Sequence, residues 1–160
     1  MKENNRYFGM KAHAPLGFPI EKEVSTWVFC MVASTFWCMR FFIRYLDYRG
    51  QLFEIRGGRK VLLENAKMPD FEYLTNNLFE IFGVVILFCV LAIVYHYYYH
   101  GQGSKMMYLM RRLPSKWELH IRCVTLPVLA SVVTVIYMLG LRMLFYAIYL
   151  FCTPAQCLII

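Results

Sequence analysis

The stretch SKMMYLMRRLPSKWELH, residues 104–120, lies between two strongly apolar runs and has helical order of its own. Its first half places apolar residues at intervals of three and four, which gives one stripe on a helix: Met106, Leu109, Met110 and Leu113. Pro114 ends that helix, because its ring removes a hydrogen-bond donor and clashes with the preceding turn. Ser115 is a favoured N-cap for a second helix that begins at Lys116. The stretch therefore predicts two helices joined at a basic corner, here called the elbow.

Three apolar runs surround the elbow, at residues 24–46, 78–99 and 125–151. Each is long enough to cross the ~30 Å hydrocarbon layer, which needs about 20 residues. The composition agrees, since 59% of the 160 residues are hydrophobic and only 17% are charged. Pro127 falls in the first turn of the third run, where a proline is well tolerated. The sequence predicts an all-α integral membrane protein with three transmembrane helices.

The remaining segments are a polar tail (residues 1–23), a loop (47–77), the elbow region (100–124) and a second tail (152–160). In the loop, two strand-like runs, residues 52–55 and 61–64, flank Gly57 and Gly58. Two glycines between such runs predict a tight β-hairpin. Pro69 then opens a short helix with an apolar stripe that includes Phe71 and Leu74.

Positive charge sets the expected orientation, because cytoplasmic segments carry the excess of Lys and Arg. The first tail and the elbow region together hold nine Lys and Arg residues, and the 47–77 loop with the second tail holds five. We therefore expect a multi-pass protein of the cell membrane, with a cytoplasmic N-terminus and elbow. The hairpin and the C-terminus then lie outside. Cys152 and Cys157 bracket a turn there, and they either form a disulfide or are two unrelated thiols.

Three charged residues interrupt the spans close to one membrane surface: Arg40, Glu80 and Arg142. An ionisable residue at such depth usually has a partner or lines a polar cavity. We expect Arg142 to pair with Glu80 and Arg40 to be a third member of the cluster. The alternative is independent snorkelling of the long side chains to water. His96 and His100 stand four residues apart, but no third ligand lies near them, so we expect no metal site.

Composition also excludes several functions. The net charge of +7 is spread over the segments between the spans, which suits anionic lipid or an acidic protein better than nucleic acid. The chain has no Walker motif and cannot hydrolyse ATP itself. It has no serine–histidine–aspartate set, no paired carboxylates and no Glu-x-x-His motif. We therefore expect a protein that is not an enzyme and holds no cofactor.

The order of span, outer loop, span, cytoplasmic elbow and span resembles the first half of a type-2 (exporter-type) ABC transporter permease. Residues 113–119, LPSKWEL, are similar to the Leu-Pro elbow of those permeases, and residues 108–114, YLMRRLP, are similar to small Firmicutes membrane proteins that accompany ABC transporters. The resemblance implies that the elbow is a coupling helix that docks on an ATPase subunit, where ATP binds. The docking residues would be Met110, Arg111, Arg112, Leu113, Pro114, Lys116 and Trp117.

The chain has three spans where a complete permease has six. The resemblance therefore also implies a second membrane permease chain as a partner, besides membrane lipid. The alternative is a regulatory or lipid-binding membrane subunit that transports nothing.

Overall fold

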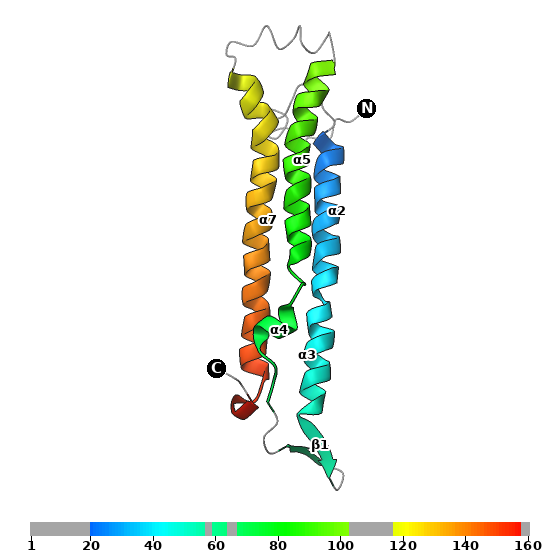
Figure 1. Ribbon diagram of the computed structural model, residues 1–160, viewed down its shortest axis with the longest axis vertical. Helices are drawn as coiled ribbons and strands as arrows, with labels where there is room; N and C mark the ends of the chain where they lie inside the picture. Colours follow the sequence, from blue (N-terminus) through cyan, green and yellow to red (C-terminus); the bar gives the residue numbers. More distant parts are fainter. Residues whose placement is uncertain (1–19, 57–58, 64–66, 103–116, 158–160) are drawn as a thin grey trace, which may run out of the picture. The chain divides into compact units, whose positions relative to one another are not determined.

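The computed structural model describes residues 20–56, 59–63, 67–102 and 117–157. These residues are mostly helical (Figure 1). The chain divides into two compact units, each described here by itself. Unit 1 contains residues up to Val32 together with Phe82–Val135, and unit 2 contains Ala33–Ile81 and the chain from Ile136 onward.

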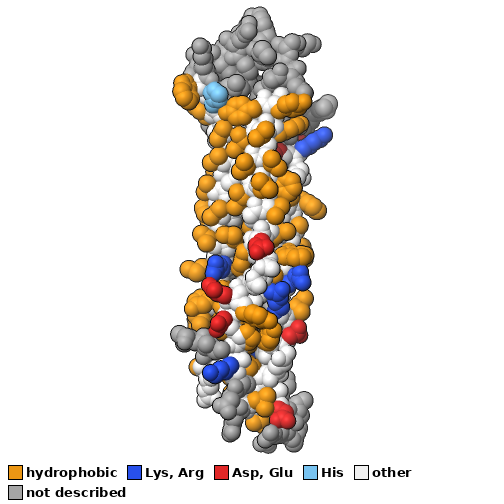
Figure 2. All heavy atoms as spheres, in the orientation of Figure 1, with side chains coloured by type: hydrophobic (Ala, Val, Ile, Leu, Met, Phe, Trp, Pro, Cys, Tyr) orange, Lys and Arg blue, Asp and Glu red, His pale blue; other side chains and the backbone are white. Residues whose placement is uncertain are grey.

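Three helical segments are long and apolar enough to cross a membrane: Ile20–Gln51, Glu80–Tyr99 and Cys123–Cys152. They confirm the three predicted spans. Only 17%, 22% and 11% of the residues in their apolar windows are buried inside the protein. Hydrophobic side chains therefore cover the outside of the helices (Figure 2). Such a surface suits lipid or another membrane chain, and the protein is a multi-pass membrane protein.

The first span differs from the uninterrupted helix expected over residues 24–46. It consists of α2 (Ile20–Cys38) and α3 (Arg40–Gln51), which meet at Met39. The Met39 amide donates to two carbonyls, those of Thr35 at 3.1 Å and Phe36 at 3.2 Å. The Phe42 amide then donates to the Met39 carbonyl over three residues, at 3.0 Å. Hydrogen bonds over three residues are those of a 3₁₀ turn, so the helix is locally tighter at Met39.

The third span also differs from the prediction. α7 (Trp117–Cys152) continues from the end of the elbow into the span as one helix, and Pro127 lies inside it. The prediction that Pro127 occupies a first turn was therefore wrong. A proline inside a helix leaves one carbonyl without its amide partner, and in membrane proteins a neighbouring helix often supplies the missing donor.

Unit 1 consists of the first part of α2, most of α5 (Glu80–Gln102) and the first part of α7. The three helices lie side by side in Figure 1, and hydrogen bonds join α2 to α5, α5 to α7 and α2 to α7. Its buried side chains include Phe82, Val85 and Cys89 of α5 and Cys123 of α7.

Unit 2 has an aromatic core. The buried rings of Phe41 on α3 and Phe145 on α7 are stacked at 4.5 Å between centroids, with 7° between their planes. Phe71 meets Phe41 edge-on at 6.2 Å. Stacked and edge-on pairs of this kind stabilise a core beyond the area they bury. Phe71 begins α4 (Phe71–Thr75), so the core holds the loop helix against α3 and α7.

Hydrogen bonds fix the loop on either side of α4. The Arg44 guanidinium donates to the carbonyls of Leu74 at 3.4 Å and Asn76 at 3.1 Å, where α4 ends. Carbonyls at a helix end lack partners within the helix, and here an arginine supplies them. Before α4, the Met68 amide donates to the carbonyl of Cys157, in the 3₁₀ turn η2 (Ala155–Cys157), at 2.9 Å.

The predicted hairpin is confirmed. β1 (Phe53–Arg56) pairs antiparallel with β2 (Arg59–Leu62), in a register that places Phe53 opposite Leu62 and Arg56 opposite Arg59. The first strand begins one residue later, and the second two residues earlier, than the runs 52–55 and 61–64 that the sequence predicts.

Candidate functional site

His96 is the centre of the polar structure in unit 1. It lies on α5 and is fully buried. Its Nδ1 atom is 2.9 Å from the backbone carbonyl of Cys123 on α7, and its Nε2 atom is 3.1 Å from Oε2 of Glu23 on α2. One imidazole ring therefore joins all three helices of the unit.

Pro127 explains why the Cys123 carbonyl is available to His96. In an α-helix this carbonyl accepts a hydrogen bond from the amide four residues later, which is residue 127. Proline has no amide hydrogen, so the helix itself cannot satisfy the carbonyl. The His96 ring supplies the missing donor from α5. Because a carbonyl can only accept, the Nδ1 atom must carry a proton.

The contact between His96 and Glu23 holds one further proton. Either Nε2 carries it, giving an imidazolium beside a carboxylate, or Glu23 carries it and donates to a neutral imidazole. The pair has no net charge in either case, which suits a buried position in a membrane span. Loss of that proton leaves two acceptors facing each other at 3.1 Å, with an unpaired negative charge. The pair is therefore a site for one proton.

A second polar contact fixes the neighbouring turn of α2. The Trp27 indole Nε1–H donates to the hydroxyl of Thr134 on α7 at 3.1 Å, and that hydroxyl donates to the Ala130 carbonyl at 2.8 Å. Thr134 is fully buried. The contact gives the indole N–H its partner and sets the position of the ring.

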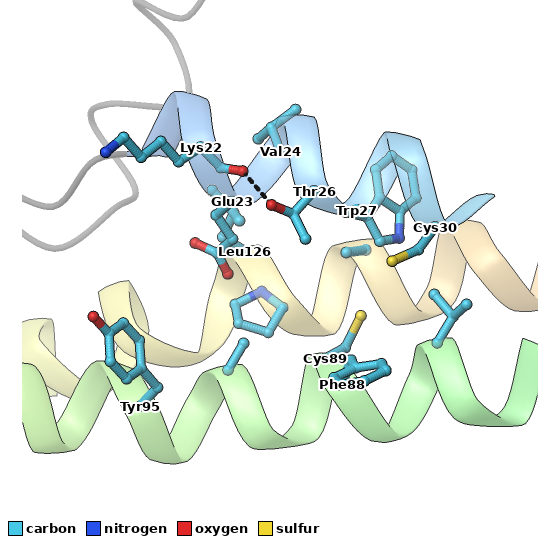
Figure 3. A pocket seen from close by; sticks show the side chains of 14 residues that line it. Lys22, Glu23, Val24, Thr26, Trp27, Cys30, Phe88, Cys89, Tyr95 and Leu126 are labelled. Carbon is cyan, nitrogen blue, oxygen red and sulfur yellow. Dashed lines mark hydrogen bonds between the residues drawn. The ribbon is translucent and has the colours of Figure 1, made fainter. Parts of the chain in front are cut away.

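A cavity of about 500 Å³ lies among the three helices of unit 1, beside both contacts. Figure 3 shows Glu23, Trp27 and Cys30 directed from α2 toward the other two helices, and the Lys22 ammonium directed away. The Glu23 side chain is 19% exposed while its carboxylate contacts His96. The cavity is lined by Lys22, Glu23, Val24, Thr26, Trp27, Cys30, Val85, Phe88, Cys89, Ala92, Tyr95, Leu126, Pro127 and Ala130.

Most of the predicted docking residues lie outside the described residues: Met110, Arg111, Arg112, Leu113, Pro114 and Lys116. Trp117 is described. It is the first residue of α7, its side chain is 73% exposed, and its ring meets His120 edge-on at 6.1 Å between centroids. A tryptophan at the end of the elbow is thus accessible to lipid or to another protein.

The three charged residues predicted to cluster all lie in unit 2. The Arg142 guanidinium lies 3.9 Å from the carboxylate of Glu72 on α4. The sequence had predicted Glu80 as the partner of Arg142. Glu80 is the exposed first residue of α5. Arg40 instead lies over the Trp37 ring, 4.6 Å from its centroid. Arg142 and Glu72 are both exposed, and a pair of this kind contributes only ~0–1 kcal/mol in water.

The sequence also raised a disulfide at the C-terminal end and a pair of histidines on the second span. Cys152 is exposed and Cys157 is buried, and both are free thiols in the structure. The disulfide between them stays a prediction for the protein in an oxidising compartment. The side chain of His100 is outside the described part of the chain. Among the described side chains, no group of three His, Cys, Asp or Glu is arranged to hold a metal ion.

Comparisons of the chain with models of protein families, with curated proteins and with solved structures found no match. The site in unit 1 was missed by reasoning from sequence, because its two ionisable members are 73 residues apart. One signal was present. A histidine inside an apolar run needs partners for both ring nitrogens, and a proline inside a span supplies an unsatisfied carbonyl.

Proposed function

We propose that the chain is a membrane subunit of a multi-chain ABC transporter. It acts as a half-permease or as an accessory subunit, and it docks on an ATPase subunit through the elbow. The observation that carries the proposal is the exposure of Trp117, the elbow residue at which α7 begins. Tryptophan is one of the residues most enriched among the anchors of protein interfaces.

The charges near Trp117 fit the same role. Arg111, Arg112 and Lys116 precede it closely in sequence. Charges at the rim of an interface guide the encounter and fix its register, whereas the aromatic anchor contributes most of the binding free energy. An acidic groove on an ATPase subunit, lined with apolar residues at its base, is the complementary surface.

The outer faces of the spans support a second membrane partner. Large apolar side chains point outward along α5 and α7, among them Leu87, Leu91, Ile136 and Met143. In a membrane such faces pack equally well against lipid and against other helices, so association depends on their shape and on polar contacts. A second permease chain would complete the six spans that the resemblance implies.

Co-purification tests the proposal. The tagged full chain is extracted from its native membranes with a mild detergent, and the ATPase subunits that accompany it are quantified by mass spectrometry. Trp117→Ala should reduce the bound ATPase strongly, because loss of an anchor costs about 2 kcal/mol or more, a factor of ~30 in affinity. Arg112→Glu should also reduce it, by placing a negative charge against an acidic groove. Lys116→Ala, a loss of one rim charge, should have a smaller effect.

The second candidate function is a regulatory or lipid-binding subunit that transports nothing. The same exposed Trp117 favours it, since tryptophan is enriched at membrane–water interfaces and basic residues beside it attract anionic lipid. If wild type and all three variants carry the same amount of ATPase, or none, the docking role is wrong and this second candidate replaces it.

A further inference from the structure

We propose that the cavity in unit 1 binds a hydrophobic organic cation, which takes the Glu23 carboxylate and releases the proton that Glu23 shares with His96. This function is separate from the docking of an ATPase, and it needs only the residues of α2, α5 and α7 that line the cavity.

The size and lining of the cavity suit a small amphipathic molecule. Its volume of about 500 Å³ falls within the range of roughly 300–1,000 Å³ that is usual for small-molecule sites. Its wall is largely apolar, with valine, leucine, alanine and cysteine side chains from three helices. Such a wall favours a ligand with a large hydrophobic body over sugars, nucleotides or free inorganic ions.

The charge that faces the cavity is negative. The Glu23 carboxylate is directed toward α5 and α7, and the Lys22 ammonium is directed away (Figure 3). Three aromatic residues also line the cavity: Trp27, Phe88 and Tyr95. The faces of aromatic rings attract cations, most strongly where water is excluded. A carboxylate among aromatic rings therefore recognises a cation with an apolar surface, and rejects an anion of the same shape.

The exchange balances in charge. Before binding, one proton lies between His96 Nε2 and Glu23 Oε2, and the pair is neutral. When the cation pairs with the Glu23 carboxylate, that proton leaves to solvent. His96 then remains as a neutral imidazole that still donates from Nδ1 to the Cys123 carbonyl. One positive charge enters the site and one leaves it, so the buried site carries no net charge at either end of the exchange.

Other titratable side chains near the pair or the cavity, among those that the structure describes, include Glu21, Lys22 and Cys30 on α2, Cys89, Tyr95, Tyr97, Tyr98 and Tyr99 on α5, and His120 and Cys123 on α7. His120 contacts the Tyr97 hydroxyl at 2.9 Å and is exposed. Glu23 Oε2 lies at hydrogen-bond distance, 3.1 Å, from the His96 Nε2 atom. The proton released on binding is therefore assigned to the pair of Glu23 and His96.

Tetraphenylphosphonium is a suitable probe, because its charge is permanent and it cannot exchange a proton itself. The full chain is purified in an uncharged maltoside detergent, and binding is measured by equilibrium dialysis with the labelled cation. Release of one proton requires the affinity to rise about tenfold for each unit of pH while the pair still holds its proton. Titration calorimetry in two buffers of different ionisation enthalpy counts the released proton directly. Tetraphenylborate, an anion of the same shape, should bind at least tenfold more weakly.

Two variants complete the test. Glu23→Gln keeps the shape of the side chain and a hydrogen bond to His96, but removes the charge. It should weaken binding of tetraphenylphosphonium at least tenfold and abolish the dependence on pH. Glu21→Gln is the matched control, because Glu21 is an exposed acid in the same turn of α2 and does not line the cavity. It should bind like wild type.

Three results would overturn the proposal: equal binding of the cation and the anion, binding by wild type with no release of a proton, or no measurable binding by wild type. Equal loss in Glu21→Gln and Glu23→Gln would also overturn it, since the effect would then reflect overall charge. The measurements on wild type need no variant, so they decide the question even if Glu23→Gln fails to fold. None of these results depends on whether an ATPase binds the elbow.

Discussion

Among single residues, Pro127 and His96 act as a complementary set on two different helices. The proline removes the amide that would bond the Cys123 carbonyl, and the histidine returns an N–H to that carbonyl at 2.9 Å. The other ring nitrogen lies 3.1 Å from Glu23. A buried carbonyl or carboxylate without a partner costs more than the hydrogen bond is worth, so these residues should be energetically coupled.

Substitution at both positions tests that coupling. His96→Ala should lower the free energy of unfolding by about 1–3 kcal/mol, because the Cys123 carbonyl loses its donor. Pro127→Ala should then stabilise the His96→Ala protein more than it stabilises wild type, because the alanine amide can reach the carbonyl. Thermal unfolding in detergent of wild type, the two single variants and the double variant gives the coupling free energy between the two positions. An equal effect of Pro127→Ala in both backgrounds would show that the two residues act independently.

The contact between Trp27 and Thr134 provides a second residue-scale prediction. Thr134→Val keeps the side-chain volume but leaves the indole N–H without its acceptor. We expect a loss of stability of about 1 kcal/mol, typical of a hydrogen bond between membrane helices. Thr125→Val is the control, because the Thr125 hydroxyl donates to the Ile121 carbonyl of its own helix at 2.6 Å. The same unfolding assay should show little change in the control, and an equal loss in both would contradict the account.

Sequence reasoning could recognise the residue types of this site but not their pairing. His96 was visible as a histidine in an apolar run, and Glu23 as an acid at the start of a span. Their contact depends on how three helices pack, which neither hydropathy nor spacing reports. Trp117 was predicted as a docking residue from its place in the elbow. Its side chain is exposed, and its docking role stays a prediction.

At the scale of elements, α4 is held mainly by groups outside itself. With five residues it is too short to be stable alone, since isolated helices need about 12–15 residues. Phe71 packs on the aromatic core, and Arg44 supplies hydrogen bonds to the carbonyls where the helix ends. The helix should therefore unfold locally when the arginine is removed.

Arg44→Met tests that expectation, because methionine keeps the apolar stem and removes the guanidinium. We expect the backbone amides of residues 71–78 to exchange with deuterium about tenfold faster, the effect of ~1.4 kcal/mol in local opening. Arg40→Met is the matched control, since the Arg40 guanidinium lies over the Trp37 ring. Unchanged exchange in Arg44→Met, or the same increase in both variants, would contradict the role given to Arg44.

The apolar composition of the long runs and the paired glycines predicted the three spans and the hairpin. The change of helix at Met39 and the course of α7 were not predicted. Three long apolar runs gave three helices, and two glycines between strand-like runs gave the hairpin. The change of helix at Met39 had no proline or glycine to signal it. The sequence did not predict that α7 continues through Pro127, because proline usually interrupts the hydrogen bonds of its own helix. Here His96 on α5 donates to the Cys123 carbonyl that the proline leaves without a partner.

At the scale of the whole molecule, the nine Lys and Arg residues of the first tail and elbow region, against five in the other polar segments, predict a cytoplasmic elbow. Thiol labelling of intact cells with an impermeant reagent tests it, using Ser104→Cys and Gly58→Cys in a chain whose own cysteines are replaced by alanine. We expect labelling at position 58 and none at position 104. The opposite pattern would reverse the orientation and would place Cys152 and Cys157 in a reducing compartment.

Photo-crosslinking from position 117 identifies the molecule that contacts the elbow in the native membrane. A benzophenone amino acid replaces Trp117 in the full chain, and the native membranes are irradiated and analysed by mass spectrometry. Benzophenone captures lipid and protein alike, so each candidate function leaves its own product. The same amino acid at Leu129, an exposed position within the span on the same helix, is the control. We expect a crosslink from position 117, and none from position 129, to a subunit that contains a Walker motif. A crosslink from position 117 to lipid alone would contradict the docking of an ATPase on the elbow.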